Sequence, residues 1–199
     1  ASDSSSSSES SQSSGSSKAS SNDGSPLPVG TVLGDYELLE FTTRGSRTDT
    51  FVALQRSVDR RVGLRMLRPE FMDSNSGRSG FRAEAQAKAA VKHSKIASVF
   101  ECLEDEHGLY YTQELLEGRS LSDLLNAGEK LDEETLLSVV KSAAEAFKYL
   151  FDQDVNYAPI WPEHIFLDED ANVRVSNTAL EDLPEGKPRQ QEQIKNLAK

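Results

Sequence analysis

The chain offers few side chains that could work together in thiol or metal chemistry. Its single cysteine, Cys102, excludes an internal disulfide and a cysteine-based zinc cluster. Its place in an apolar, strand-like run favours a small buried side chain over a reactive thiol. The histidines His93, His107 and His164 are too far apart in sequence to indicate a pair of ligands. The sequence therefore predicts no metal site.

The densest group of cationic side chains does not indicate a nucleic-acid site. At alternating strand spacing these arginines are divided between two faces, which favours a solvated strand face. The whole chain has 33 acidic and 22 basic residues, a net charge of −11, and such a surface repels a phosphate backbone. We therefore expect no nucleic-acid partner. The arginines are Arg56, Arg60, Arg61, Arg65 and Arg68.

The first 27 residues are predicted to be a disordered, serine-rich linker. Fifteen of the first 25 residues are serine, and such a segment cannot bury enough apolar surface to offset the entropy of ordering the chain. No apolar run approaches the roughly 18 residues of a membrane span. We expect no membrane insertion by this segment and a cytoplasmic location.

From residue 36 the pattern predicts a strand-rich half followed by a helical half. The apolar positions Leu136, Leu137, Val140, Ala144, Phe147 and Leu150 predict one buried stripe on the longer helix of the second half. The expected strands are 36–41, 50–55, 61–67, 97–105, 108–114, 165–168 and 173–176. The expected helices are 81–92, after a loop at 73–80, then 120–126, 132–150 and one that starts at 190.

The order of these elements, together with four short motifs, resembles the protein kinase superfamily, most closely its bacterial Ser/Thr kinase branch. Residues 62–65 are similar to the strand that carries the nucleotide-binding lysine, and 81–85 to helix C. Residues 114–121 resemble the hinge, and 160–167 resemble the catalytic loop.

The resemblance implies an α+β, protein-kinase-like fold with two lobes. We expect a five-stranded antiparallel small lobe with helix C at residues 28–117. A truncated, mainly helical large lobe is expected at residues 118–199.

At the catalytic loop the resemblance implies that the family's chemistry is degenerate. Tyr157, Ala158 and Pro159 stand where the family has His-Arg-Asp, and His164 stands where it has a metal-binding Asn. A proline has no side-chain oxygen to accept a proton. Asn177 stands at the position of the metal-binding Asp and is interpreted as a remnant of the nucleotide pocket.

At the nucleotide pocket the resemblance matches Arg65 to the family's lysine and Glu84 to its helix C glutamate. The favoured interpretation is a surviving structural ion pair, and the alternative is a phosphate clamp. Thr43 and Thr48 replace two of the three glycines of the phosphate loop, whereas Gly45 remains. Both pocket residues are therefore interpreted as vestigial.

We predict a catalytically inactive domain, a pseudokinase rather than an enzyme. It would act as a protein-interaction or allosteric scaffold for another protein or for further domains of the same chain. The alternatives are an ATP-binding sensor, or a weak or atypical Ser/Thr kinase or nucleotidyl transferase that uses the same cleft. No cofactor is expected, unless ATP binds weakly and without metal.

Overall fold

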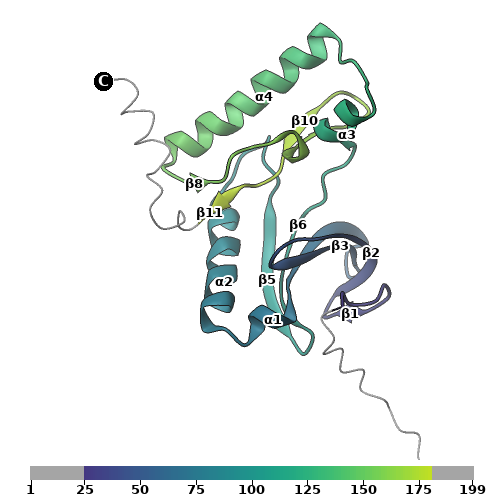
Figure 1. The fold of residues 1–199 in the computed structure, drawn as a ribbon, viewed down its shortest axis with the longest axis vertical. Helices are drawn as coiled ribbons and strands as arrows, with labels where there is room; N and C mark the ends of the chain where they lie inside the picture. The colour runs from purple at the N-terminus through teal and green to yellow at the C-terminus, as the bar shows by residue number, and fades with distance from the viewer. Residues whose placement is uncertain (1–24, 181–199) are drawn as a thin grey trace, which may run out of the picture.

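The computed structural model describes residues 25–180 and shows a curled antiparallel sheet beside one long helix, joined to a second, mainly helical part (Figure 1). The strand order of the sheet is β1-β2-β3-β4-β6-β5. Its strands are β1 (Val32–Leu33), β2 (Tyr36–Arg44), β3 (Thr48–Gln55), β4 (Arg60–Leu67), β5 (Val99–Asp105) and β6 (Gly108–Glu114).

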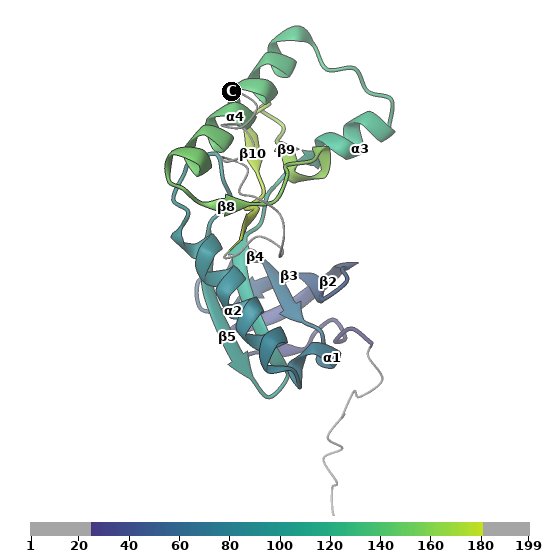
Figure 2. The same cartoon turned by 60° about the vertical axis from the view of Figure 1, so that its left-hand side comes forward.

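Helices and three short strand pairings complete the fold. In the first part, helix α2 lies along the sheet, whereas α3 and α4 cover short strands of the second part (Figure 2). The helices are α1 (Pro69–Met72), α2 (Asn75–Ala90), α3 (Leu121–Asn126), α4 (Glu133–Asp152) and the 3-10 helix η1 (Pro162–His164). The remaining strands are β7 (Arg119–Ser120), β8 (Asn156–Tyr157), β9 (Ile165–Leu167), β10 (Val173–Val175) and β11 (Ala179–Leu180).

The sheet forms because its strands alternate apolar side chains between two cores. On one face, α2 packs Phe81 and Ala85 against a cluster that includes Tyr111 of β6. The opposite face closes around Tyr36 and Phe51. The sequence predicted five strands, and β1 adds a sixth, two-residue strand at the edge.

Helix α2 begins six residues earlier than the sequence indicated, at Asn75 instead of residue 81. Its N-cap is Ser74, whose side chain accepts a hydrogen bond from the backbone N–H of Gly77. A Cβ atom at Gly77 would stand 2.4 Å from the carbonyl oxygen of Phe71. The glycines that suggested a loop therefore permit the close approach of α1 to the first turn of α2.

Helix α4 buries a different face from the predicted one. Asp132 caps it by accepting a hydrogen bond from the backbone N–H of Thr135 at 2.7 Å. The prediction that Leu136, Leu137 and Val140 belong to the buried stripe is wrong, because these side chains are exposed. The buried residues of α4 are Val139, Ser142, Ala146 and Leu150.

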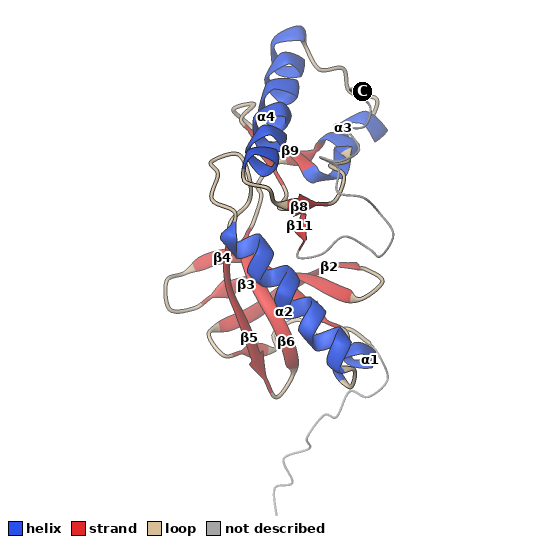
Figure 3. Cartoon of the chain, turned by 90° about the vertical axis from the view of Figure 1, so that its left-hand side faces the viewer, coloured by secondary structure: helices blue, strands red, loops and turns tan. Residues whose placement is uncertain are grey.

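The two parts are connected by backbone as well as by side chains. The N–H of Ala97 donates to the carbonyl of Val175 at 2.9 Å, and the N–H of Val175 donates to the carbonyl of Lys95 at 2.7 Å. The β8–β11 pair lies between α4 and the end of α2 (Figure 3). The end of α2 therefore sits directly against the second part.

Two sequence predictions fall on residues outside the described range. The helix expected from residue 190 lies outside it, as does nearly all of the linker expected at residues 1–27. Within residues 25–180, no helix is both long and apolar enough to cross a bilayer.

The chain passes from the first part to the second through Gly118, which tolerates no side chain. Its φ is +88°, and a Cβ atom there would lie 1.9 Å from the carbonyl oxygen of Leu167. The backbone of the crossing strand thus touches the backbone of β9 directly. Any larger residue has to push the two segments apart.

We expect Gly118→Ala to lower the free energy of unfolding by more than about 2 kcal/mol, since it combines a strained φ with a backbone clash. Chemical denaturation measures the loss. The matched control is Gly80→Ala in α2, where the nearest side-chain atom is 3.6 Å away and φ is helical. That variant should gain about 0.5–1 kcal/mol from helix propensity. Equal stability of the two variants would contradict the close approach at Gly118.

Candidate functional site: the polar cleft between β4 and helix α2

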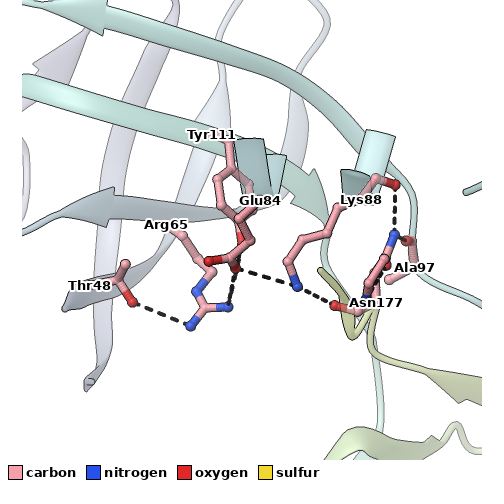
Figure 4. A network of polar contacts seen from close by, with 8 residues as sticks. Thr48, Arg65, Glu84, Lys88, Ala97, Tyr111 and Asn177 are labelled. Atoms are coloured by element: carbon pink, nitrogen blue, oxygen red, sulfur yellow. Dashed lines mark hydrogen bonds and ion pairs between the residues drawn. The ribbon is translucent and has the colours of Figure 1, made fainter. Parts of the chain in front are cut away.

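Two of the predicted site residues meet across the first part of the molecule. Arg65 projects from β4 and Glu84 from α2, and Arg65 Nη1 lies 3.8 Å from Glu84 Oε1 (Figure 4). Their side chains are about one-third exposed, at 34% and 30%. The structure therefore brings these two residues together as an ion pair at the edge of the cleft.

Arg65 also has two hydroxyl partners within the protein. Its Nη1 donates to the Tyr111 hydroxyl at 3.3 Å, and its Nη2 donates to Thr48 Oγ1 at 3.3 Å. Burial alone would lower the pKa of Arg65, but Tyr111 and the Glu84 carboxylate together raise it above the ordinary value. The guanidinium is thus permanently charged and held on three sides. Its buried Nε has no hydrogen-bond partner among residues 25–180.

A small cavity lies beside this guanidinium, under the β2–β3 turn. Its volume is about 210 Å³, and Arg47 and Arg65 give it two cationic groups against the single carboxylate of Glu84. It can therefore accept an anionic group of limited size. The other lining residues are Gly45, Ser46, Thr48 and Phe81.

Lys88 is a functional residue that the sequence reasoning missed. It follows Glu84 by one helical turn on the same face of α2, and only 4% of it is exposed. Its Nζ lies 3.5 Å from Glu84 Oε1 and donates a hydrogen bond to the backbone carbonyl of Asn177. Burial lowers the pKa of Lys88 to about 8, against the opposing effect of Glu84. The spacing of four residues from Glu84 was the available signal.

Asn177 points away from the cavity and into the junction between the two parts. Its Nδ2 donates to the carbonyls of Lys88 at 2.8 Å and Ala97 at 3.2 Å. Its Oδ1 accepts from the N–H of Ala179 at 3.2 Å. The side chain is buried and all of its hydrogen-bonding capacity faces protein. The structure therefore joins Asn177 to Lys88 and Glu84, but turns its amide away from the cavity.

The predicted loop positions are scattered over different environments. Tyr157 packs its ring against Phe147 in the core under α4, with ring centroids 5.7 Å apart. Ala158 donates its N–H to the carbonyl of Thr178 at 2.9 Å, and Pro159 is exposed. These three residues do not join the polar cleft.

His164 belongs to η1 and keeps a defined tautomer. Its Nδ1 accepts a hydrogen bond from the backbone N–H of Trp161 at 3.0 Å, so the neutral ring carries its proton on Nε2. Burial lowers the pKa of His164, and the positive charges of Lys88 and Arg65 lower it further despite the opposing carboxylate of Glu163. The imidazole is therefore a neutral donor under the field of both cations.

The cleft contains no obvious metal-binding group. Among residues 25–180, no three His, Cys, Asp or Glu side chains come together in a way that could hold a metal ion. The expected absence of a metal ligand set remains a prediction for the rest of the chain.

Comparisons with solved structures define the class of fold. The kinase domain of Mycobacterium tuberculosis PknI superposes with a TM-score of 0.63 at 15% identity, covering 77% of this chain and 63% of that chain. Rad53 1–466 in complex with AMP-PNP superposes with a TM-score of 0.65 at 17% identity, covering 73% of this chain and 39% of that one. The fold is the two-lobed α+β fold of protein kinases.

The sequence comparisons define the family. The protein kinase domain family matches residues 36–180, so the chain belongs to the protein kinase family. Serine/threonine-protein kinase PrkC of Bacillus subtilis is 24% identical over 146 residues, covering 73% of this chain and 22% of the relative. PknA of Corynebacterium glutamicum is 27% identical over 148 residues, covering 72% and 32%. The chain thus spans between about a fifth and a third of these relatives.

The prediction that the domain is not an enzyme is contradicted by these relatives. They are curated as serine/threonine-protein kinases, which points to an enzyme even though the identity is low and the coverage of each relative is partial. The sequence argument treated the missing carboxylate at Pro159 as the absence of the reaction. One side chain is too narrow a basis for that conclusion, because it removes one route for a proton and no more.

We expect the free energy of unfolding to rise with pH above about pH 8 because of Lys88. Its pKa is about 8 in the folded protein and 10.5 in the ordinary state, so between these values the unfolded chain binds more protons. The slope is therefore positive, and the full gain is at most about 3 kcal/mol. Denaturation curves of wild type and Lys88→Met, taken from pH 7 to pH 10.5, measure the difference.

The difference between proteins is the relevant quantity, since buried tyrosines such as Tyr111 act in the opposite direction in the same pH range. Burial raises the pKa of Tyr111, so its contribution to stability falls as the pH rises. Lys141→Met, at an exposed site on α4, is the control and should keep the wild-type slope. Identical slopes in Lys88→Met and wild type would contradict the burial of a charged Lys88.

Proposed function

We propose that this domain is an allosteric, protein-interaction module of the Ser/Thr kinase family. Its two lobes would present a defined surface to another protein or to further domains of the same chain. The observation that supports the proposal most is the set of contacts of Arg65. The guanidinium is held by Thr48, Tyr111 and Glu84, so the cleft has its polar groups in place before any ligand binds.

ATP is the ligand that the kinase family binds, and the described cleft fits it poorly. The cavity of about 210 Å³ is smaller than the roughly 300–1,000 Å³ of ordinary ligand pockets. The hydroxyl of Thr48 occupies Arg65, and the amide of Asn177 faces the lobe junction. The carboxylate in the cleft, Glu84, already faces two cations.

These contacts support weak ATP binding that does not depend on a divalent metal. Direct contact between phosphate oxygens and Arg47 or Arg65 needs no bridging ion, because guanidinium groups pair with phosphate without help. The neutral Nε2–H of His164 adds a donor that no metal ion would use. The ligand would thus be recognised as an anion and not as a metal complex.

We expect ATP to bind with a dissociation constant of about 100 μM or weaker, equal within twofold in excess Mg²⁺ and in EDTA. Isothermal titration measures both values. Arg65→Met should weaken binding about tenfold in both buffers, whereas Arg78→Met, on the exposed side of α2, should leave it unchanged. A micromolar dissociation constant that appears only with Mg²⁺ would contradict the proposal.

A second candidate is a weak or atypical Ser/Thr kinase, and the curated relatives favour it. On this candidate the ion pair of Arg65 and Glu84 positions a nucleotide for phosphoryl transfer. We expect transfer of label from ATP to a basic protein substrate in Mg²⁺ or Mn²⁺, reduced at least tenfold in Glu84→Gln. Arg78→Met again serves as the control. Transfer that persists undiminished in Glu84→Gln would point to a contaminant and reject this candidate.

A further inference from the structure

The junction between α2 and the segment after β10 holds a reciprocal set of hydrogen bonds (Figure 4). The amide of Asn177 donates to the carbonyls of Lys88 and Ala97, while the amine of Lys88 donates to the carbonyl of Asn177. Both residues are almost completely buried, with 4% of Lys88 and 6% of Asn177 exposed. Each residue is thus both donor and acceptor toward the other.

We propose that Lys88 and Asn177 form a polar latch that fixes helix α2 to the second part of the molecule, and that Asn177 serves this latch and not a ligand. The latch is independent of whether the domain transfers phosphate or binds partners, because it consists only of contacts within the protein.

The chemistry of the latch requires an amide at residue 177. Two carbonyl oxygens converge on Nδ2, so the group between them has to donate two hydrogen bonds. An ionised carboxylate has no proton to donate and would face both carbonyl dipoles with a negative charge. In a buried site the lost bonds and the repulsion are not relieved by water.

The latch reaches the cleft through a single helical turn. Lys88 and Glu84 are four residues apart and in contact, and Glu84 faces Arg65 on β4. A displacement of the segment at Asn177 would therefore move the end of α2 that carries Lys88. The ion pair at the cleft would change with it, because Glu84 is shared between the two cations.

The latch gives the second part of the molecule control over α2. A partner that pulls on β11, which begins two residues after Asn177, would break the bonds to the carbonyls of Lys88 and Ala97. Helix α2 would then be held only by its apolar contacts with β5 and β6. The latch is in this sense a two-state element that both parts can bias.

The test compares Asn177→Asp with Asn75→Asp, the same chemical change at an exposed position in the first turn of α2. Hydrogen exchange of the α2 amides at 84–90 should become faster on the order of tenfold in Asn177→Asp and stay unchanged in Asn75→Asp. The melting temperature should fall in Asn177→Asp alone, with no gain of Mg²⁺-dependent ATP binding by calorimetry.

If Asn177→Asp does not fold, Asn177→Ala removes both donors without adding a charge, and the same amides should still exchange faster. The latch is overturned if either folded variant keeps the wild-type exchange rate at 84–90. It is also overturned if Asn177→Asp keeps wild-type stability and acquires Mg²⁺-dependent nucleotide binding, because residue 177 would then be a ligand position.

Discussion

The architecture of the cleft depends on one carboxylate, Glu84, that faces two cationic side chains. Arg65 from β4 and Lys88 from the same helix approach the same oxygen, Oε1, at 3.8 and 3.5 Å. Two cations and one carboxylate leave an excess positive charge where water has limited access, and buried charge is costly unless it is paired and hydrogen-bonded. The lowered pKa of Lys88 is the signature of that cost.

The excess charge explains why neutral oxygens surround the pair. The hydroxyls of Thr48 and Tyr111 accept hydrogen bonds from Arg65, and the backbone carbonyl of Asn177 accepts one from Lys88. These oxygens come from β3, β6 and the segment that follows β10. The charges of α2 and β4 are therefore stabilised only when the sheet and the second part of the molecule are assembled around them.

The sequence predicted the elements better than the contacts. Alternation of apolar residues located the strands, and the family resemblance singled out Arg65 and Glu84 as a pair that the structure does bring together. It gave no sign of Lys88, because a lysine in a helix is ordinarily exposed and only the path of the chain near Asn177 covers it. The direction of the Asn177 amide follows from that same path, which no local pattern contains.

The buried face of α4 was mispredicted for a related reason. The helix carries apolar residues on two overlapping stripes, one through Leu136 and Val140 and the other through Val139 and Ala146. Periodicity gives both stripes nearly equal weight. The second stripe is buried because Ile165 and Val173 of the short β9–β10 hairpin pack against it, and this hairpin follows α4 in the chain. Local periodicity cannot include a partner that comes later.

Low identity to the kinase relatives is compatible with a fully shared fold, because the backbone and the cleft are constrained differently. The backbone requires alternating apolar residues and a few positions such as Gly118, where only the absence of a side chain permits the chain to cross β9. In the cleft, each polar group is satisfied by its neighbours, so one replacement leaves an unpaired group behind. Lys88 without the Asn177 carbonyl, or Asn177 without the Lys88 and Ala97 carbonyls, would be buried and unsatisfied. Residues of this cleft can therefore change only as a set, and what the site does has to be judged from the set and not from any single position.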